Sequence, residues 1–182
     1  MPDPAPSPDR TADRRPSATP QAAGTLPSPR RLYGTVALVE VITWALLLIG
    51  MAFKYTGVTD VLVSVFGMLH GIATVAYVLT SVFVWVNERW SPGVGLVALV
   101  AAVIPFATLP FERWTLRSGR LSTVWRLAPA SATGAAESPR GPVERLQAWC
   151  LARPLTALVL GVLLVATITA ALLVIGPPIP SD

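Results

Sequence analysis

The feature that most constrains this chain is a long apolar run from Val61 to Asn87, VLVSVFGMLHGIATVAYVLTSVFVWVN. A helix that crosses a bilayer needs about 20 mainly apolar residues at ~1.5 Å per residue, and this run exceeds that length. Its one group that titrates near neutral pH is His70. Such a run has no place in the core of a small soluble domain, so the sequence predicts an integral membrane protein.

The composition supports more than one such segment. Of the 182 residues 53% are hydrophobic and only 13% are charged, whereas soluble domains average roughly a quarter charged residues. The apolar residues are concentrated in four blocks, separated by segments that carry Pro, Gly and Arg. We therefore expect an all-α fold, a polytopic membrane helical bundle with a three-helix domain and a fourth, C-terminal transmembrane helix.

Composition shifts divide the chain into four parts. The first is a Pro/Ser/Arg-rich tail with too few large apolar side chains to offset its ordering entropy, so we expect disorder there. The predicted parts are the tail (1–31), the three-helix membrane domain (32–116, with spans at about 32–53, 61–86 and 94–111), an Arg-rich linker with interfacial helices (117–153), and the fourth transmembrane helix with a short tail (154–182).

The third span, 94–111, is short and contains Pro105. Proline removes a backbone donor and should kink this helix, and a re-entrant element is the alternative interpretation. In the second span, Gly67 and Gly71 form a G-x-x-x-G pattern. That pattern predicts close packing of another helix, or a homodimer contact.

Arginine distribution bears on membrane orientation. The tail carries several arginines, which favours a cytoplasmic N-terminus, but four spans would then place the equally basic segment 117–153 outside. If the third segment is re-entrant, both basic segments fall on the cytoplasmic side. We predict a multi-pass protein of the plasma membrane with a cytoplasmic N-terminus.

Two ionisable residues lie within predicted spans. Measured from the loop that joins the first two helices, Glu40 and His70 differ in depth by roughly 5 Å, which tilt and side-chain length absorb. We therefore expect them to form an intramembrane polar pair. Such a pair can act as a proton relay or cation site, but an interhelical hydrogen bond that fixes packing is the favoured interpretation.

Four charged residues flank the early spans. If all three segments cross the membrane, one interfacial charge cluster contains Lys54, Asp60, Glu112 and Arg113. Salt bridges are its expected use, and a headgroup or ligand site is the sharper alternative. The hydroxyls of Thr80, Thr108 and Thr167 are expected to bond the carbonyls of their own helices.

The sequence contains no pattern typical of an enzyme. One cysteine and one histidine exclude an intrachain disulfide and any His or multi-Cys metal cluster. Walker A, Gly-x-Ser-x-Gly and His-Glu-x-x-His motifs are absent from the chain. We predict no enzymatic activity, cofactor or metal. The net charge of +4 lies largely in basic flanks of apolar spans, which favours lipid headgroups as partners and not nucleic acid.

Several spaced motifs are similar to one family. They are VALVEVITWALLL with MAFKY in the first span, FGMLHGIATVAYV in the second, and IPFATLPFERW in the third. Over roughly residues 31–114 this pattern resembles the family called domain of unknown function 3817. The resemblance implies a three-helix domain of the plasma membrane without an assigned activity, in which Glu40, His70 and Pro105 are family features.

Two functions remain open at this stage. We favour a non-catalytic accessory or assembly subunit of a membrane complex, because the chain is small and has segments available for partners. The alternative is a small proton-coupled transporter that acts as a homodimer, with Glu40 as its titrating group. The expected partners are the lipid bilayer and either another membrane protein subunit or a second copy.

Overall fold

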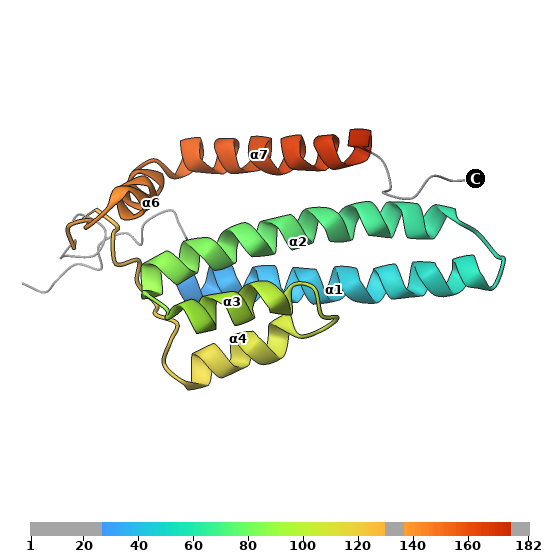
Figure 1. Ribbon diagram of the computed structural model, residues 1–182, viewed down its shortest axis with the longest axis horizontal. Helices are drawn as coiled ribbons and strands as arrows, with labels where there is room; N and C mark the ends of the chain where they lie inside the picture. Colours follow the sequence, from blue (N-terminus) through green and yellow to red (C-terminus); the bar gives the residue numbers. More distant parts are fainter. Residues whose placement is uncertain (1–26, 130–136, 176–182) are drawn as a thin grey trace, which may run out of the picture.

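The structure, a computed structural model, describes residues 27–129 and 137–175. Within these residues the chain forms only helices and connecting turns, which confirms the predicted all-α class (Figure 1). The helices are α1 (Pro29–Tyr55), α2 (Val61–Glu88), α3 (Pro92–Ala101), α4 (Thr108–Arg117), α6 (Pro142–Ala152) and α7 (Pro154–Ile175). Residues 1–26 of the predicted tail and 176–182 of the C-terminal tail lie outside the described residues.

α1 begins slightly earlier than the sequence suggested. The Ser28 side chain accepts a hydrogen bond from the Arg31 amide at 3.3 Å, and Pro29 occupies the first helical position. A capping serine followed by proline is a strong helix start, since it satisfies one free amide and avoids presenting another. Residues 29–31, assigned to the tail by composition, therefore belong to the helix.

α1 and α2 form an antiparallel pair, joined by the short turn 56–60 as predicted. Their approach is close near this turn. A Cβ atom on Gly50 would lie 3.0 Å from the Leu62 carbonyl carbon and the Val63 nitrogen. Glycine is therefore needed there for backbone to approach backbone.

The third predicted span is not one helix. α3 ends at Ala101, the chain reverses through residues 102–107, and α4 returns beside α3 (Figure 1). Pro105 lies in this turn, and Phe106 adopts a positive φ of 64°. Each helix has 10 residues, or about 15 Å, half the hydrocarbon thickness. Residues 94–111 are thus not one spanning helix as predicted, and the chain turns back on itself, as the re-entrant alternative requires.

Residues 118–129 form an irregular strap across the end of the α1–α2 pair. The Trp125 indole donates to the Pro27 carbonyl at 2.8 Å, and the Arg30 amide donates to the Ser122 carbonyl at 3.2 Å. α4 ends at Arg117, because Gly119 turns the chain with a φ of 66°, so residues 118–129 of the predicted linker are not helical. Further along the same linker, α6 is a helix.

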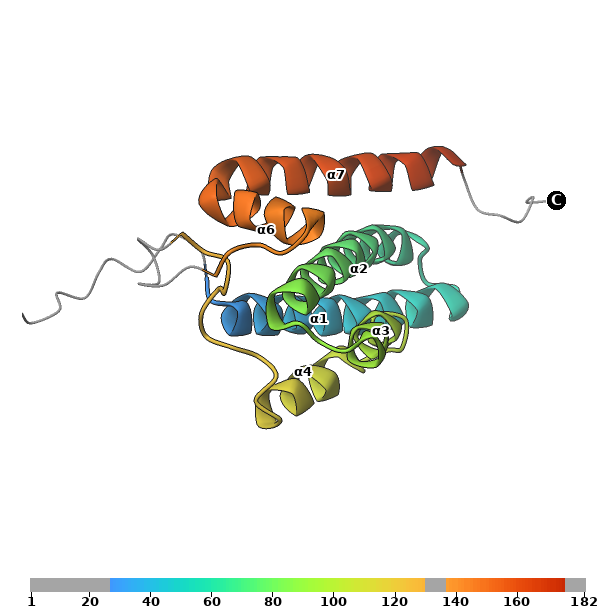
Figure 2. The ribbon, with the colours of Figure 1, turned by 60° about the vertical axis from the view of Figure 1, so that its left-hand side comes forward.

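α7 lies on one side of α2, and α1, α3 and α4 lie on the other. In both ribbon views α7 runs along α2 on the side away from α3 and α4, and α6 connects it to the strap (Figures 1 and 2). Within the described residues three helices are therefore long and apolar enough to cross a membrane: α1, α2 and α7. We call residues 29–117 the body.

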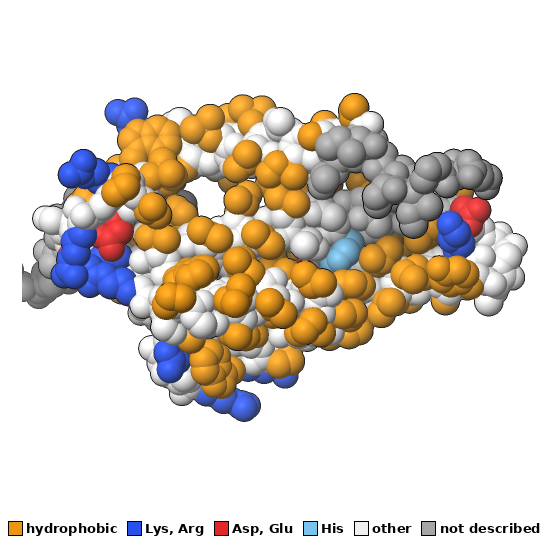
Figure 3. Space-filling view, in the orientation of Figure 1, with side chains coloured by type: hydrophobic (Ala, Val, Ile, Leu, Met, Phe, Trp, Pro, Cys, Tyr) orange, Lys and Arg blue, Asp and Glu red, His pale blue; other side chains and the backbone are white. Residues whose placement is uncertain are grey.

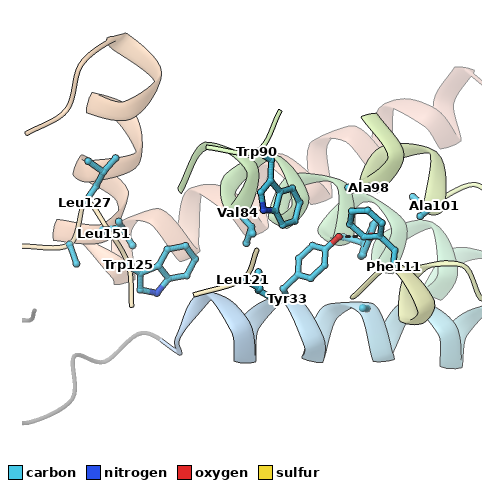
Figure 4. Close-up of a cluster of buried hydrophobic side chains, with 14 residues drawn as sticks. Tyr33, Val84, Trp90, Ala98, Ala101, Phe111, Leu121, Trp125, Leu127 and Leu151 are labelled. Carbon is cyan, nitrogen blue, oxygen red and sulfur yellow. Dashed lines mark hydrogen bonds between the residues drawn. The ribbon is translucent and has the colours of Figure 1, made fainter. Parts of the chain in front are cut away.

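The core of the body lies where α1, α2 and the re-entrant pair meet. Tyr33 packs edge-on against Trp90 and Phe111, with ring centroids 5.8 and 6.4 Å away (Figure 4). Trp90 and Phe111 complete the triangle at 5.9 Å. Edge-to-face aromatic packing fixes relative orientation as well as distance, so this cluster sets the position of α3 and α4 on α1.

Charged side chains are strongly segregated along the long axis. Arginines crowd the end where α1 begins and α2 ends, which we call the arginine-rich end, whereas the α1–α2 turn carries little charge (Figure 3). The described arginines, all in elements at the arginine-rich end, are Arg30, Arg31, Arg89, Arg113, Arg117, Arg120, Arg126, Arg140, Arg145 and Arg153.

Candidate functional site

Glu40 lies inside the body, where the tip of the re-entrant pair meets α1. Its side chain is fully buried, and Oε2 accepts a hydrogen bond of 2.7 Å from the Thr108 hydroxyl. Oε1 has no partner among the described residues. Because Thr108 is the first residue of α4, the carboxyl also lies near the positive end of that helix dipole. One carboxyl thus ties the returning helix to α1.

The Thr108 hydroxyl does not bond a carbonyl of its own helix, although the sequence predicted that it would. Instead, it reaches α1, with Glu40 Oε2 at 2.7 Å and the Ala37 carbonyl at 3.4 Å. Thr167 behaves as expected and donates to the Leu163 carbonyl at 2.7 Å. The difference follows from position, because Thr108 starts a helix at a contact between elements and Thr167 lies within a single helix.

His70 is held by two threonines and does not bond the Glu40 side chain. Its Nδ1 lies 3.2 Å from the Thr43 hydroxyl, and its Nε2 lies 3.3 Å from the Thr74 hydroxyl. Thr43 in turn donates to the Glu40 backbone carbonyl at 2.8 Å. The predicted direct pair is therefore not formed, and the two residues are linked only through Thr43.

The bonds of Thr43 bear on the state of the imidazole. A hydroxyl has one proton, and Thr43 gives it to the Glu40 carbonyl, so its oxygen accepts from Nδ1–H of His70. Nε2 can then accept from Thr74, which is the arrangement of a neutral ring. The Trp44 indole covers the same ring, with centroids 4.3 Å apart.

A second polar contact lies nearer the arginine-rich end of the body. The hydroxyls of Tyr33 and Tyr77 are 2.7 Å apart, and both side chains are fully buried. Ser81, one turn from Tyr77, has a buried hydroxyl without a partner among the described residues. Sequence reasoning missed this pair because neither tyrosine is charged. The signal was their spacing, since Tyr33 and Glu40 lie two turns apart on one helical face.

The predicted interfacial cluster is divided between the two ends of the molecule. Lys54 and Asp60 lie at the α1–α2 turn. Glu112 is buried near the start of α1, with Oε1 3.1 Å from where a Cβ of Gly34 would lie, and Arg113 is exposed beside it on α4. About 20 residues of α1, roughly 30 Å, separate Gly34 from Lys54. The cluster prediction was wrong because the third segment returns to the side from which it entered.

The ion-pair network that does form involves Arg126 of the strap. Its guanidinium contacts Glu144 at 2.9 Å and Glu137 at 3.1 Å. The same side chain donates to the carbonyls of Asn87 and Val86 at 2.9 and 3.1 Å. These carbonyls belong to the last turn of α2, where carbonyls have no amide partner within the helix, so Arg126 caps α2 and joins it to the start of α6.

Two further arginines extend this network. Arg89 pairs with Glu137, and Arg140 bonds the same carboxylate at 3.0 Å. The hydrogen bond from Arg89, followed by that from Arg126, lowers the pKa of Glu137 below its ordinary value. The Arg140 amide and the Arg126 side chain lower the pKa of Glu144 in the same direction. Both carboxylates are therefore held ionised at neutral pH.

The glycines used for packing are not those that the motif predicted. A Cβ on Gly71 would meet nothing within 4 Å, and one on Gly67 only the Leu47 side chain at 3.8 Å. The close contact is at Gly95, where a Cβ would lie 2.1 Å from the Trp85 ring. Pro105 lies in the turn between α3 and α4 and does not kink a helix.

No described group of three or more His, Cys, Asp or Glu side chains is arranged to hold a metal ion. The cavities near α7 are lined almost entirely by apolar side chains, and Glu40 does not open into them. Among the described residues, the groups around Glu40 and His70 provide hydrogen bonds and two titratable side chains.

The three long apolar helices define this chain as a helical membrane protein. Residues 30–117 match the family described as "Domain of unknown function (DUF3817)". This confirms the resemblance noted in the sequence, and the matched residues coincide with the body.

One curated relative extends the comparison. A Streptomyces coelicolor protein, SCO5905, whose name describes it as a membrane protein, is 45% identical over 93 residues. The match covers 50% of this chain and 11% of the relative, so the chain spans about a tenth of that protein's length. No solved structure matches the chain.

Proposed function

We propose that this protein is a non-catalytic accessory or assembly subunit of a larger complex in the plasma membrane. The observation that carries the proposal is the use made of Glu40. An intramembrane carboxyl is costly and is normally retained for a function or for a specific packing contact. Here it is fully buried and bonded to Thr108, so it joins α1 to the start of α4.

The comparison with the relative supports the same proposal. In that protein the matched region is a small part of a much longer membrane polypeptide. A domain that occurs beside so much additional chain is suited to work with other membrane segments. The long exposed apolar faces of α1, α2 and α7 offer surface for such contacts.

The proposed orientation places the arginine-rich end in the cytoplasm. Cytoplasmic flanks of transmembrane helices carry an excess of Lys and Arg. With a re-entrant third segment, the start of α1, the strap and α6 share one end of the molecule, and the ten described arginines lie there. The conflict between the two basic segments, which arises with four spans, disappears with three.

Single-cysteine labelling tests this orientation. In a Cys150→Ala background, Asp60→Cys reports on the α1–α2 turn and Ser118→Cys on the strap. A membrane-impermeant maleimide should label Asp60→Cys in intact cells, and Ser118→Cys only after the membrane is opened. The reverse pattern would contradict the proposed orientation.

Native mass spectrometry tests the proposed function. The tagged protein is extracted gently from its own membranes, with an unrelated tagged membrane protein as the control. We expect a stoichiometric second polypeptide that the control lacks. That polypeptide should fall in abundance in cells without this protein. A bare monomer or homodimer, with no such change in abundance, would contradict an accessory role.

One observation favours the alternative, a proton-coupled transporter acting as a homodimer: Glu40 Oε1 is buried without a partner among the described residues. Glu40→Gln separates the two functions. A glutamine can still accept the Thr108 hydrogen bond, so we expect the fold and the bound subunit to be retained. A transporter would instead lose its pH-dependent flux, because the amide does not titrate.

A further inference from the structure

The space between α7 and the body is unusually large for neighbouring helices. Two adjoining cavities of about 780 and 1090 Å³ lie there, and they are open between the helices in the space-filling view (Figure 3). Both share lining residues from α1, α2 and α7. The shared residues are Leu32, Leu79, Phe83, Ala157, Leu158 and Gly161.

Two of the α7 residues that line this groove are not covered by the body. Leu158 lines both cavities and is 64% exposed. Gly161 lines both as well, and a Cβ there would meet nothing within 4 Å. Protein interiors are packed without voids of this size. In a membrane such a space is filled by hydrocarbon, from lipid or from another helix.

The lining of the groove suits a lipid chain. Apolar side chains line both cavities almost entirely, and Ala157 and Gly161 on α7 are small. A helix with its side chains is about 10 Å across. An acyl chain is thinner and flexible, so it can follow a groove bounded by such small residues.

A charged group lies where a headgroup would be. Arg153 lines the larger cavity at the arginine-rich end, immediately before α7 begins. Its guanidinium lies over the Trp149 ring, 5.9 Å from the centroid, and Trp149 lines the same cavity. Arg153 has no acidic partner among the described residues. A guanidinium pairs well with a phosphate, and tryptophan is common at headgroup depth.

We propose that the groove between α7 and the body binds one anionic phospholipid, with its phosphate on Arg153 and an acyl chain along Gly161. The many arginines at the same end of the molecule favour an anionic over a zwitterionic headgroup. The lipid would then act as part of the packing between α7 and the body.

Native mass spectrometry of the full chain with phosphatidylglycerol or phosphatidylcholine tests the site. The wild-type protein should retain one lipid and prefer phosphatidylglycerol by about tenfold. Arg153→Gln should remove most of that preference. Gly161→Leu should lose both lipids, because the added side chain projects into the stretch that the two cavities share and blocks the path of the acyl chain. Two matched controls, Arg117→Gln and Gly93→Leu, should behave as wild type, since both positions lie away from the groove.

Several outcomes would overturn the proposal. These are equal retention of the two lipids by the wild type, equal effects of Arg117→Gln and Arg153→Gln, or lipid retention by Gly161→Leu. If Gly161→Leu is not monodisperse, Ala157→Leu takes its place. A second polypeptide in the groove would appear as a lipid-free complex that Gly161→Leu disrupts, and that result would also count against the lipid. The lipid count does not depend on the accessory role, so either proposal can fail alone.

Discussion

The body and α7 are both apolar helices, yet they pack in opposite ways. At Gly95 in the body a Cβ would lie 2.1 Å from the Trp85 ring, whereas at Gly161 in α7 it would meet nothing within 4 Å. The body is also joined by buried polar contacts, such as Thr108 to Glu40. Among its described residues, α7 makes no side-chain hydrogen bond to the body.

This difference shows what hydropathy does and does not determine in a membrane protein. Apolar length places a helix in the bilayer, but lipid tails are as apolar as leucine and give no drive toward association. Helices associate through close packing and hydrogen bonds, which the body has. The mean hydropathy of α7 is similar to that of α1, but none of its apolar stretch is buried. Its described residues also make no side-chain hydrogen bond to the body. Its position depends on α6 and, as proposed above, on lipid.

The largest effect is expected from Gly95→Leu. The new side chain cannot occupy the space of the Trp85 ring, so α3 must leave α2, and overpacking of this severity should prevent a stable body. The folded yield and the thermal unfolding midpoint in detergent measure this. Gly161→Leu makes the same chemical change in open space and should leave the midpoint nearly unchanged. Equal losses in the two variants would remove the contrast between the regions.

A smaller effect is expected where the two regions join. Arg126→Gln removes guanidinium bonds to the last turn of α2 and to Glu144, and should lower the free energy of unfolding by about 2 kcal/mol. Hydrogen exchange should rise in the last turn of α2 and in α6. Arg117→Gln, at an exposed position, should change stability by less than about 0.5 kcal/mol. A protected α6 in Arg126→Gln would mean that other contacts hold it.

The smallest effect is expected on the stability of the protein in acid. The pKa values of Glu137 and Glu144 are lowered in the folded protein, so their ion pairs contribute stability above the ordinary carboxyl pKa of about 4.5. This contribution is lost as the pH falls through the lower, folded pKa values. The unfolding midpoint of Glu144→Gln should therefore lie slightly below that of wild type at pH 7 and converge with it in acid. A difference that persists at low pH would exclude ion pairing as its cause.

The sequence predicted the helices far better than their contacts. The run from Val61 to Asn87 is long and apolar enough to allow little except a span, and α2 covers it. Residues 94–111 are equally apolar, and Pro105 fits a kinked span or a turn between half-length helices. That one ambiguity moved Glu112 and Arg113 to the wrong end of the molecule.

The candidate site was partly predictable for the same reason. A carboxyl within a span is conspicuous, so Glu40 was found from sequence alone. Its partner Thr108 is 68 residues away and was expected to bond within its own helix. Only the return of α4 brings the two together. The tyrosine pair likewise depends on the register between α1 and α2, which no local pattern encodes.

The cap on α2 has a consequence for truncated chains. The carbonyls at the end of α2 are bonded by Arg126, and the Phe83 carbonyl by Gln147 at 2.7 Å, which lies 64 residues later in the chain. The end of α2 is therefore closed by residues that follow the bonded carbonyls by 39 and 64 positions in the chain. Chains truncated before Gln147 lack part of this closure, so the end of α2 should be more accessible to proteases in them than in the full chain.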